Sequence, residues 1–337
     1  MTLPQGSSAA PRVSVVVPAY NSAHFIEGTL QTALDQTFRD LEILVVDDGS
    51  DDRTADVVRG VMARDSRVRV LVQPHRGLSA ARNHAIGAAR GEFIALLDHD
   101  DLWHPRKLAL QVALLDAHDE VAVVSCYSAL IDERHRCLGW QFGGAANGDV
   151  YAEMLEWDMV SGGSVPLIRR AAIDQIGRFD ETLALREDWD AWIRLARRER
   201  FATVPLALVG YTRSASNSSR DYEGMAREGT VVLKKILRDD PAFSARYRFC
   251  QARDYFSIAC FCAIDRRPAL AWKYVVRSAM CAPAPLLRSP RRCAFVGVLA
   301  LQSLMPRALF QPLFGAITRI AFQLEPGRPF LAPMERS

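Results

Sequence analysis

A short acidic run constrains this chain more than any other feature of its sequence. Asp98, Asp100 and Asp101 lie within four residues, directly after the apolar run 93–97. A buried strand that ends in negative charge places that charge at the carboxyl edge of a sheet, where open α/β folds bind their ligands. Clustered carboxylates repel one another unless a cation lies among them. Oxygen ligands on a short loop suit Mg²⁺ or Mn²⁺, whereas an acidic run standing alone would favour a solvated loop.

The first hundred residues alternate between apolar runs and helical patterns. In chain order, we expect strand 13–17, helix 25–34, strand 41–46, helix 54–63, strand 68–72, helix 77–90 and strand 93–97. This alternation is typical of βαβ units. It predicts an α/β fold with a mainly parallel sheet flanked by helices.

The pattern after residue 100 is less regular. We expect a strand at 121–130, a loop at 140–148 and a helix at 188–198 whose tryptophans point inward. From about Tyr222 onward the pattern is helical and is broken by prolines. The sequence therefore predicts a catalytic or binding domain over 11–220 and a C-terminal helical appendage over 221–337.

The net charge of +3 hides an uneven distribution along the chain. Residues 241–337 carry thirteen arginines and one lysine against four acidic residues, a net charge of +10, so residues 1–240 sum to −7. A basic tail on an acidic body predicts contact with something anionic. The seven cysteines form no C-x-x-C pair, so we expect neither a disulfide framework nor a zinc site, and a reducing cytoplasm fits best. We expect no signal peptide and no membrane-spanning helix.

Three further groups of polar residues could carry chemistry. Asp47 and Asp48 end the second predicted strand and could accept from a base N–H or a ribose hydroxyl, or could form a simple turn. Arg76 and Arg82 begin the third predicted helix, where phosphate is favoured; the alternative is an ordinary charged helix face.

The third group begins the predicted helix 188–198. Asp188 lies between acidic neighbours and beside Trp189 and Trp192. A carboxylate against an aromatic wall is partly desolvated, which raises its pKa toward the range of a general base. The alternative is that acidic residues stabilise the N-terminus of the helix.

These motifs together resemble the family 2 glycosyltransferases. The resemblance rests on VSVVVPAYN at 13–21, VVDDGS at 45–50, RGLSAARN at 76–83, GEFIALLDHDDLW at 91–103, GRFDE at 177–181 and EDWD at 187–190. Several motifs in the correct order are more specific than any one of them. The resemblance covers residues 11–220, and residues 221–337 match nothing that we would name.

The resemblance implies a GT-A fold with a nucleotide-binding sheet, a nucleotide-sugar donor (a UDP-sugar is favoured), Mg²⁺ or Mn²⁺, and hexosyl transfer with inversion. It implies that Asp48, with Asp47 near it, contacts the nucleoside and that Asp188 is the catalytic base. Asp98 and Asp100 would form the D-x-D motif, with Asp100 the direct metal ligand and Asp98 nearer the ribose. The remaining donor contacts would be Pro18, Ala19 and Tyr20 at the base pocket and Arg82 at the diphosphate.

Three other classes of protein fit the sequence less well. A nucleotidyltransferase should have a glycine-rich phosphate loop with a lysine near the N-terminus, and residues 13–30 have neither. A dinucleotide-binding oxidoreductase would need G-x-G-x-x-G after the first strand. A non-catalytic sugar- or nucleotide-binding regulator on a transferase scaffold is disfavoured by the presence of Asp48, Asp98, Asp100 and Asp188 together.

The basic tail predicts where such an enzyme works. Its cations, which lie among apolar segments, are Arg266, Arg267, Lys273, Arg277, Arg288, Arg291 and Arg292. Arginine-bearing amphipathic helices suit the anionic inner face of a cell membrane and a polyprenyl-linked or saccharide acceptor, with no nucleic acid partner. The alternative is that these helices pack on the catalytic domain and leave their arginines outward.

Overall fold

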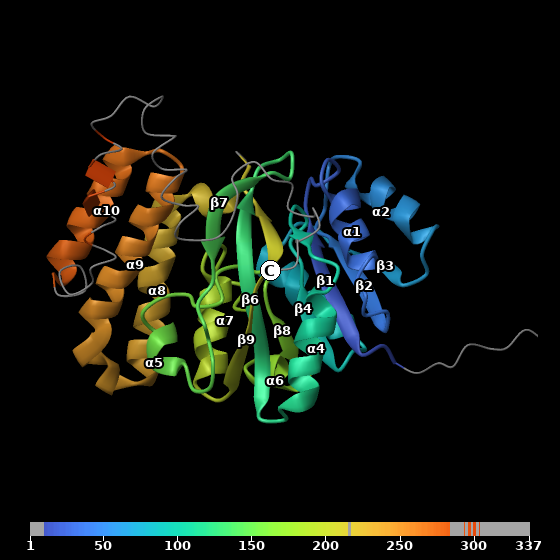
Figure 1. Cartoon of the computed structure of the whole chain (residues 1–337), viewed down its shortest axis with the longest axis horizontal. Coiled ribbons are helices and arrows are strands. Elements are labelled where there is room, and N and C mark those ends of the chain that lie inside the picture. Colours follow the sequence, from blue (N-terminus) through green and yellow to red (C-terminus); the bar gives the residue numbers. More distant parts are fainter. Residues whose placement is uncertain are drawn as a thin grey trace, which may run out of the picture.

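The computed structural model describes residues 10–214 and 217–283 and the single positions 293, 296, 297, 299, 300 and 303. One sheet organises it (Figure 1). Its strands are β1 (Val13–Ala19), β2 (Leu41–Asp47), β3 (Val68–Val72), β4 (Phe93–Leu96), β5 (Leu102–Trp103), β6 (Val121–Ile131), β7 (Cys137–Phe142), β8 (Leu167–Arg169) and β9 (Arg200–Thr212). They follow the spatial order β3-β2-β1-β4-β8-β6-β9-β5, and β7 pairs with β6.

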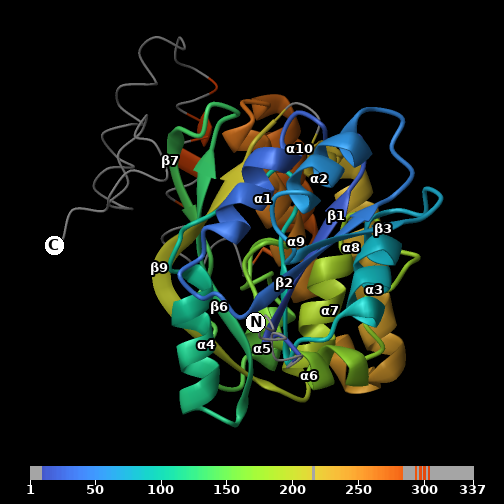
Figure 2. The same cartoon turned by 90° about the vertical axis from the view of Figure 1, so that its right-hand side faces the viewer.

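Helices cover this sheet. They are α1 (Ile26–Leu34), α2 (Thr54–Met62), α3 (Leu78–Ala88), α4 (Lys107–Ala117), α5 (Tyr151–Met154), α6 (Arg170–Gln175), α7 (Glu187–Ala196), α8 (Tyr222–Asp239), α9 (Ser244–Ile264) and α10 (Pro268–Cys281). Figure 1 shows α8, α9 and α10 grouped at the end of the molecule opposite α1 and α2, and Figure 2 views the molecule from the side of α1 and α2. No helix in the described ranges is long and apolar enough to cross a membrane.

The α/β fold with flanking helices is confirmed, with one difference in the sheet. Strands β1 to β4 pair in parallel as expected. In the second half, β8, β5 and β7 run antiparallel to their neighbours, so the sheet is mixed. The loop predicted at 140–148 is partly wrong, because Gln141 and Phe142 continue β7 and complete its pairing with β6.

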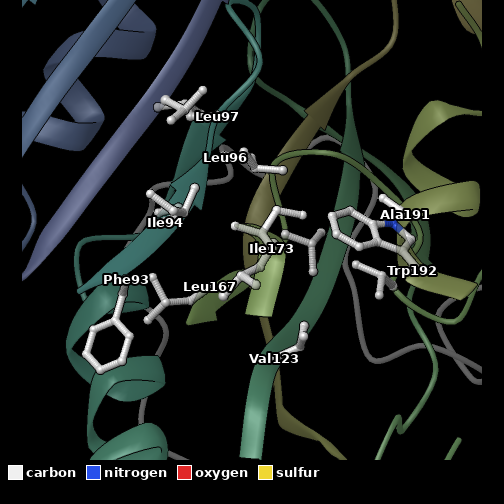
Figure 3. Packing of buried hydrophobic residues seen from close by; sticks show 14 of the residues in the cluster. Phe93, Ile94, Leu96, Leu97, Val123, Leu167, Ile173, Ala191 and Trp192 are labelled. Atoms are coloured by element: carbon white, nitrogen blue, oxygen red, sulfur yellow. The ribbon is translucent and has the colours of Figure 1, made fainter. Parts of the chain in front are cut away.

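The apolar core fixes the helix that begins with the EDWD motif. Figure 3 shows Trp192 of α7 and Ile173 of α6 packed toward strand residues such as Leu167. Trp192 is fully buried, and Trp189 is 1% exposed. The Trp189 indole N–H also donates to the Met154 carbonyl at 2.8 Å. Truncating a buried tryptophan costs about 3–5 kcal/mol, so these two rings hold α7 in one position.

The C-terminal helices share the core of the sheet. Val232, Leu233 and Ile236 of α8 belong to the same buried cluster as β1 and β4. A smaller cluster joins α8, α9 and α10 through residues such as Tyr274. The structure thus confirms a helical C-terminal region, while the domain boundary at 220 stays a prediction.

The basic residues of the tail lie partly inside the described ranges. Lys273 and Arg277 of α10 both pair with Glu223 of α8, Arg277 at 3.4 Å. Two of the cations expected to face an anionic surface therefore contact a neighbouring helix. The predictions for Arg288, Arg291, Arg292 and the apolar segment 294–304 fall on positions that, in the main, lie outside the described residues.

Candidate active site

The acidic run after β4 contains three carboxylates with three different environments. Asp101 is buried and accepts from the Ser164 hydroxyl at 2.6 Å and from the Thr212 backbone N–H at 2.9 Å. Both of its oxygens are occupied, so Asp101 holds the loop to β9. Asp98 accepts from the Arg82 guanidinium at 2.7 Å. The Asp100 carboxylate accepts from the Asn217 amide at 3.2 Å, and the Asp100 backbone carbonyl accepts from the Thr212 hydroxyl at 2.5 Å.

Arg82 joins the acidic run to α7. Its guanidinium is 1% exposed and donates to Asp98 at 2.7 Å and to Glu187 at 2.9 Å. Burial alone would lower the pKa of Arg82, but Asp98 and Glu187 raise it above its usual range. Its Nε has no hydrogen-bond partner among the described residues. Arg82 is therefore a permanently charged link between two carboxylates, and its buried Nε–H donates to no described residue.

Asp188 is the carboxylate next along α7. Its side chain accepts from the Trp189 backbone N–H at 2.7 Å. Burial raises the pKa of Asp188, although Arg82 partly offsets the shift. This direction agrees with the sequence argument, because a desolvated carboxylate holds protons more tightly. It makes Asp188 a stronger base than a solvated aspartate.

Two more carboxylates crowd this end of the site. Burial, followed by the charge of Asp188, raises the pKa of Asp158 to about 7 and that of Glu187 to about 8. Asp158 accepts from the Val160 and Ser161 backbone N–H groups, each at 2.9 Å. Both carboxyl groups therefore hold their protons more tightly than solvated carboxyl groups do.

These groups line one cavity of about 370 Å³. Its charged lining residues include Arg82, Asp98, Asp158, Glu187 and Asp188. The C-terminal helices also line it, with apolar residues (Met225, Phe256, Phe261 and Ile264) and polar ones (Arg253, Asp254, Ser257 and Cys260). The fold therefore brings three of the predicted residues, Arg82, Asp98 and Asp188, into a single chamber.

The predicted nucleoside residues lie at the neighbouring strand edge. Asp47 ends β2 and Asp48 follows it, and the end of β2 pairs with Pro18 and Ala19 of β1. Asp47 accepts from the Ser50 N–H at 3.0 Å. Both carboxylates are almost fully buried, so each is held mainly by the chain itself.

Asp48 organises the loop before α3. It accepts from the Gln73 amide at 2.7 Å and from the backbone N–H groups of Arg76 and Gly77 at 2.9 and 2.8 Å. His75 lies 2.9 Å from the same carboxylate. Asp48 thus sets the shape of this loop.

Two aromatic rings form the rim of this edge. The His75 ring stacks on Tyr20 with 4.1 Å between centroids, and both side chains are exposed. The guanidinium of Arg76 points elsewhere and pairs with Glu181 at 2.8 Å. The sequence analysis did not single out His75.

The residues of the D-x-D motif fit a divalent cation shared with a substrate. No group of three or more His, Cys, Asp or Glu side chains in the described ranges could hold a metal alone. Asp98 and Asp100 supply two carboxylates, and Mg²⁺ usually completes its shell with water and phosphate oxygens. Burial raises the pKa of Asp100, the charge of His99 partly offsets this shift, and the charge of Asp98 adds to it. A cation at Asp100 would favour its ionised carboxylate.

Two acidic residues that the sequence argument did not single out hold the segment before Asp188. Glu228 of α8 accepts from the backbone N–H groups of residues 184, 185 and 186 at 2.8 to 3.2 Å. Asp254 of α9 pairs with Arg186 at 2.5 Å, and both side chains are buried. These contacts fix the N-terminus of α7 from the C-terminal helices. They join residues more than forty positions apart, so no local pattern could have indicated them.

Comparisons with known proteins give a consistent result. The model of the family described as glycosyl transferase family 2 matches residues 14–176. An uncharacterised glycosyltransferase of Rickettsia typhi is 30% identical over 243 residues, covering 68% of this chain and 74% of the relative. A Haemophilus influenzae glycosyltransferase, also uncharacterised, is 26% identical over 241 residues, covering 68% and 73%.

Solved structures share the fold. A mannosyltransferase from Pyrobaculum calidifontis in complex with GDP-Man and Mn²⁺ aligns over 94% of this chain and 89% of its own, with a TM-score of 0.59 and 22% identity. TarS from S. aureus in complex with UDP-GlcNAc aligns over 87% of each chain, with a TM-score of 0.59 and 19% identity. Both confirm the predicted architecture of sheet and helices.

Proposed function

The chain belongs to glycosyl transferase family 2, and from this premise we propose that it moves a hexose from a nucleotide-diphospho-sugar to an acceptor hydroxyl with inversion. The observation that carries the proposal is the placement of Asp188 and Asp98 on one cavity. A desolvated carboxylate then faces the space beside the edge of the sheet where a donor would bind.

The proposed reaction is a single displacement. The acceptor oxygen bonds to the anomeric carbon while the bond from that carbon to the diphosphate oxygen breaks. The leaving nucleoside diphosphate takes the electron pair, and Asp188 takes the proton of the hydroxyl. The raised pKa of Asp188 suits this task, because a general base works best when its pKa lies near the pH at which the enzyme operates.

Charge balance explains the other residues. Asp98 and Asp100 would hold Mg²⁺ or Mn²⁺, which would neutralise negative charge developing on the departing diphosphate. Arg82 holds Asp98 and Glu187 in place and keeps positive charge beside the reacting centre.

The strand edge at Asp48 is proposed to bind the nucleoside. Tyr20 and His75 offer an aromatic surface for a base, and Pro18, Ala19 and Asp47 support it from β1 and β2. Arg76 would contribute through the loop that Asp48 orders. GDP-Man and UDP-GlcNAc, the ligands of the two structural neighbours, are the first donors to test, with UDP-sugars favoured.

The setting of the reaction is part of the same proposal. A role in cell-surface polysaccharide or glycolipid synthesis, on the cytoplasmic face of the membrane, is supported by the basic C-terminal region. The acceptor would then be a saccharide or a polyprenyl-linked saccharide.

The test of the proposal is the variant Asp188→Asn with Mn²⁺ and a panel of nucleotide sugars. Because the amide cannot accept the proton, kcat should fall at least about a hundredfold, the usual contribution of a general base. Calorimetry should give an unchanged donor Kd. The matched control is Glu120→Gln, whose side chain is 55% exposed and does not line the cavity. Near wild-type turnover by Asp188→Asn would disprove the assignment.

A further inference from the structure

The chain at the end of β9 contacts the acidic loop at two places. The Thr212 hydroxyl donates to the Asp100 backbone carbonyl at 2.5 Å, and the Thr212 backbone N–H donates to Asp101 at 2.9 Å. Five residues later, the Asn217 amide donates to the Asp100 carboxylate at 3.2 Å. The segment after β9 therefore contacts both the backbone and the side chain of Asp100.

Hydrogen bonds within this segment fix the Asn217 side chain. Its amide oxygen accepts from the Ser214 backbone N–H at 2.5 Å and from the Ser214 hydroxyl at 3.0 Å. The Ser214 carbonyl in turn accepts from the Arg220 guanidinium at 3.1 Å. Because these donors hold the amide oxygen, the amide N–H is the group that Asn217 turns toward Asp100.

A carboxylate just past α9 anchors the segment. Asp265 pairs with Arg213 at 2.7 Å and with Arg220 at 2.9 Å, and it also accepts from the Tyr222 hydroxyl. The side chains of Asp265 and Arg213 are 3% and 6% exposed. Arg213 also donates to the Ser219 hydroxyl at 2.7 Å. Asp265 thus gives Arg213 and Arg220, which lie before and after Asn217, one common buried anchor.

We propose that Asn217 and Asp265 are positioning residues for the metal ligand Asp100, so that the C-terminal helices complete the metal site. The inference rests on the proposed function, which places the cation at Asp100. Groups that hydrogen-bond a metal ligand orient it, and removing one typically lowers metal affinity about tenfold to a hundredfold. Without Asp265, Arg213 and Arg220 would lose their shared anion, and Asn217 would no longer be held against Asp100.

The chain offers a matched buried cluster away from the site. Glu42 near the start of β2 is 2% exposed and pairs with Arg69 at 3.0 Å and with Arg90 at 2.9 Å. Like Asp265, it is a buried carboxylate shared by two guanidinium groups. It lies at the opposite end of β2 from Asp48, about 20 Å along an extended strand. Glu42→Gln therefore removes a comparable buried charge without touching the acidic loop.

The experiment measures nucleotide affinity by calorimetry in Mn²⁺ and, separately, in EDTA. The probe is UDP or GDP, whichever binds the wild-type protein more tightly. In Mn²⁺, Asn217→Ala and Asp265→Asn should each raise the Kd about tenfold or more, whereas in EDTA each Kd should stay within about twofold of the wild-type value. Glu42→Gln should lose stability in urea unfolding, as Asp265→Asn does, but should keep the wild-type Kd in both conditions.

Two results would overturn the inference. One is a wild-type Kd in Mn²⁺ for Asn217→Ala or for folded Asp265→Asn, and the other is an equal rise in Kd in Mn²⁺ and in EDTA. Both leave the Mn²⁺ dependence of the wild-type protein intact, so the proposed function would stand. If circular dichroism shows that Asp265→Asn does not fold, Asn217→Ala decides, because its side chain is only half-buried. Wild-type nucleotide binding that does not depend on Mn²⁺ would reject the metal in the proposed function, and this inference with it.

Discussion

Removing the charge of Asp254 tests whether the C-terminal helices hold the catalytic segment. The Arg186–Asp254 pair has side-chain exposures of 8% and 4%, so Asp254→Ala leaves a guanidinium buried without its counter-charge. Breaking one partner of a buried pair costs about 3–5 kcal/mol of stability. The exposed pair of Arg59 and Asp56, at 62% and 63% exposure, is the matched control. Asp56→Ala should cost less than about 1 kcal/mol.

The assay has a stability and a catalytic part. Urea unfolding, monitored by tryptophan fluorescence, gives the loss of stability. Steady-state kinetics in the absence of urea, at a temperature where both variants are folded, gives kcat. Because Arg186 lies two residues before Asp188, a shift of about 1 Å in α7 would reduce kcat about a hundredfold. A stability loss for Asp254→Ala no larger than that of Asp56→Ala would refute the reasoning.

A double variant separates the charge from the position. Replacing both partners by apolar residues, as in Arg186→Met with Asp254→Leu, removes the uncompensated charge and should restore most of the stability lost by Asp254→Ala. It does not restore the directional ion pair that locates the segment before Asp188. We therefore expect stability to recover while kcat stays low. Recovery of kcat together with stability would show that the pair acts only through folding.

Three further perturbations test individual contacts of the site. Asp188→Asn removes the charge that, after burial, raises the pKa of Asp158 to about 7, so the pKa of Asp158 should fall, as an NMR titration of its carboxyl carbon would measure; an unmoved pKa of Asp158 would contradict the coupling. Asp100→Ala should weaken donor binding only when Mn²⁺ is present, and a calorimetric titration with the wild-type Mn²⁺ dependence would count against a metal there. Gly163→Ala would place a methyl group against the Arg82 guanidinium and 2.8 Å from Asp98, so kcat/KM should fall about tenfold or more. Wild-type kinetics would instead mean that the Arg82 side chain moves freely.

The sequence predicts the parts of the site that follow from local pattern. A buried strand ending in acids located Asp98 and Asp100 at the sheet edge, and the tryptophans beside Asp188 located its helix. The resemblance to the family then connected these segments. β7 was missed because its short run 137–142 carries no strict alternation, and its pairing depends on the bulged partner β6.

Contacts between distant segments could not be predicted in this way. Glu228 and Asp254 look like ordinary helix-surface acids in the sequence, and only the packing of α8 and α9 on α7 gives them a role. Asp158 lies in a loop without a motif, and its raised pKa comes from burial in a cavity that the chain forms only when folded. The arrangement of charge around Asp188 is a property of the assembled layers.

The ion pairs that Asp254 and Asp265 form with arginines outside α9 limit how the enzyme can be shortened. A chain ending after α8 would lose Asp254 and Asp265 together with the residues of α9 that line the cavity. It would also leave Arg186 and Arg213 without these carboxylate partners. Any loss of lipid affinity in such a fragment would then reflect damage to the reaction chamber as much as loss of a membrane anchor. Charge reversal on the outward surface of the intact protein would separate these effects.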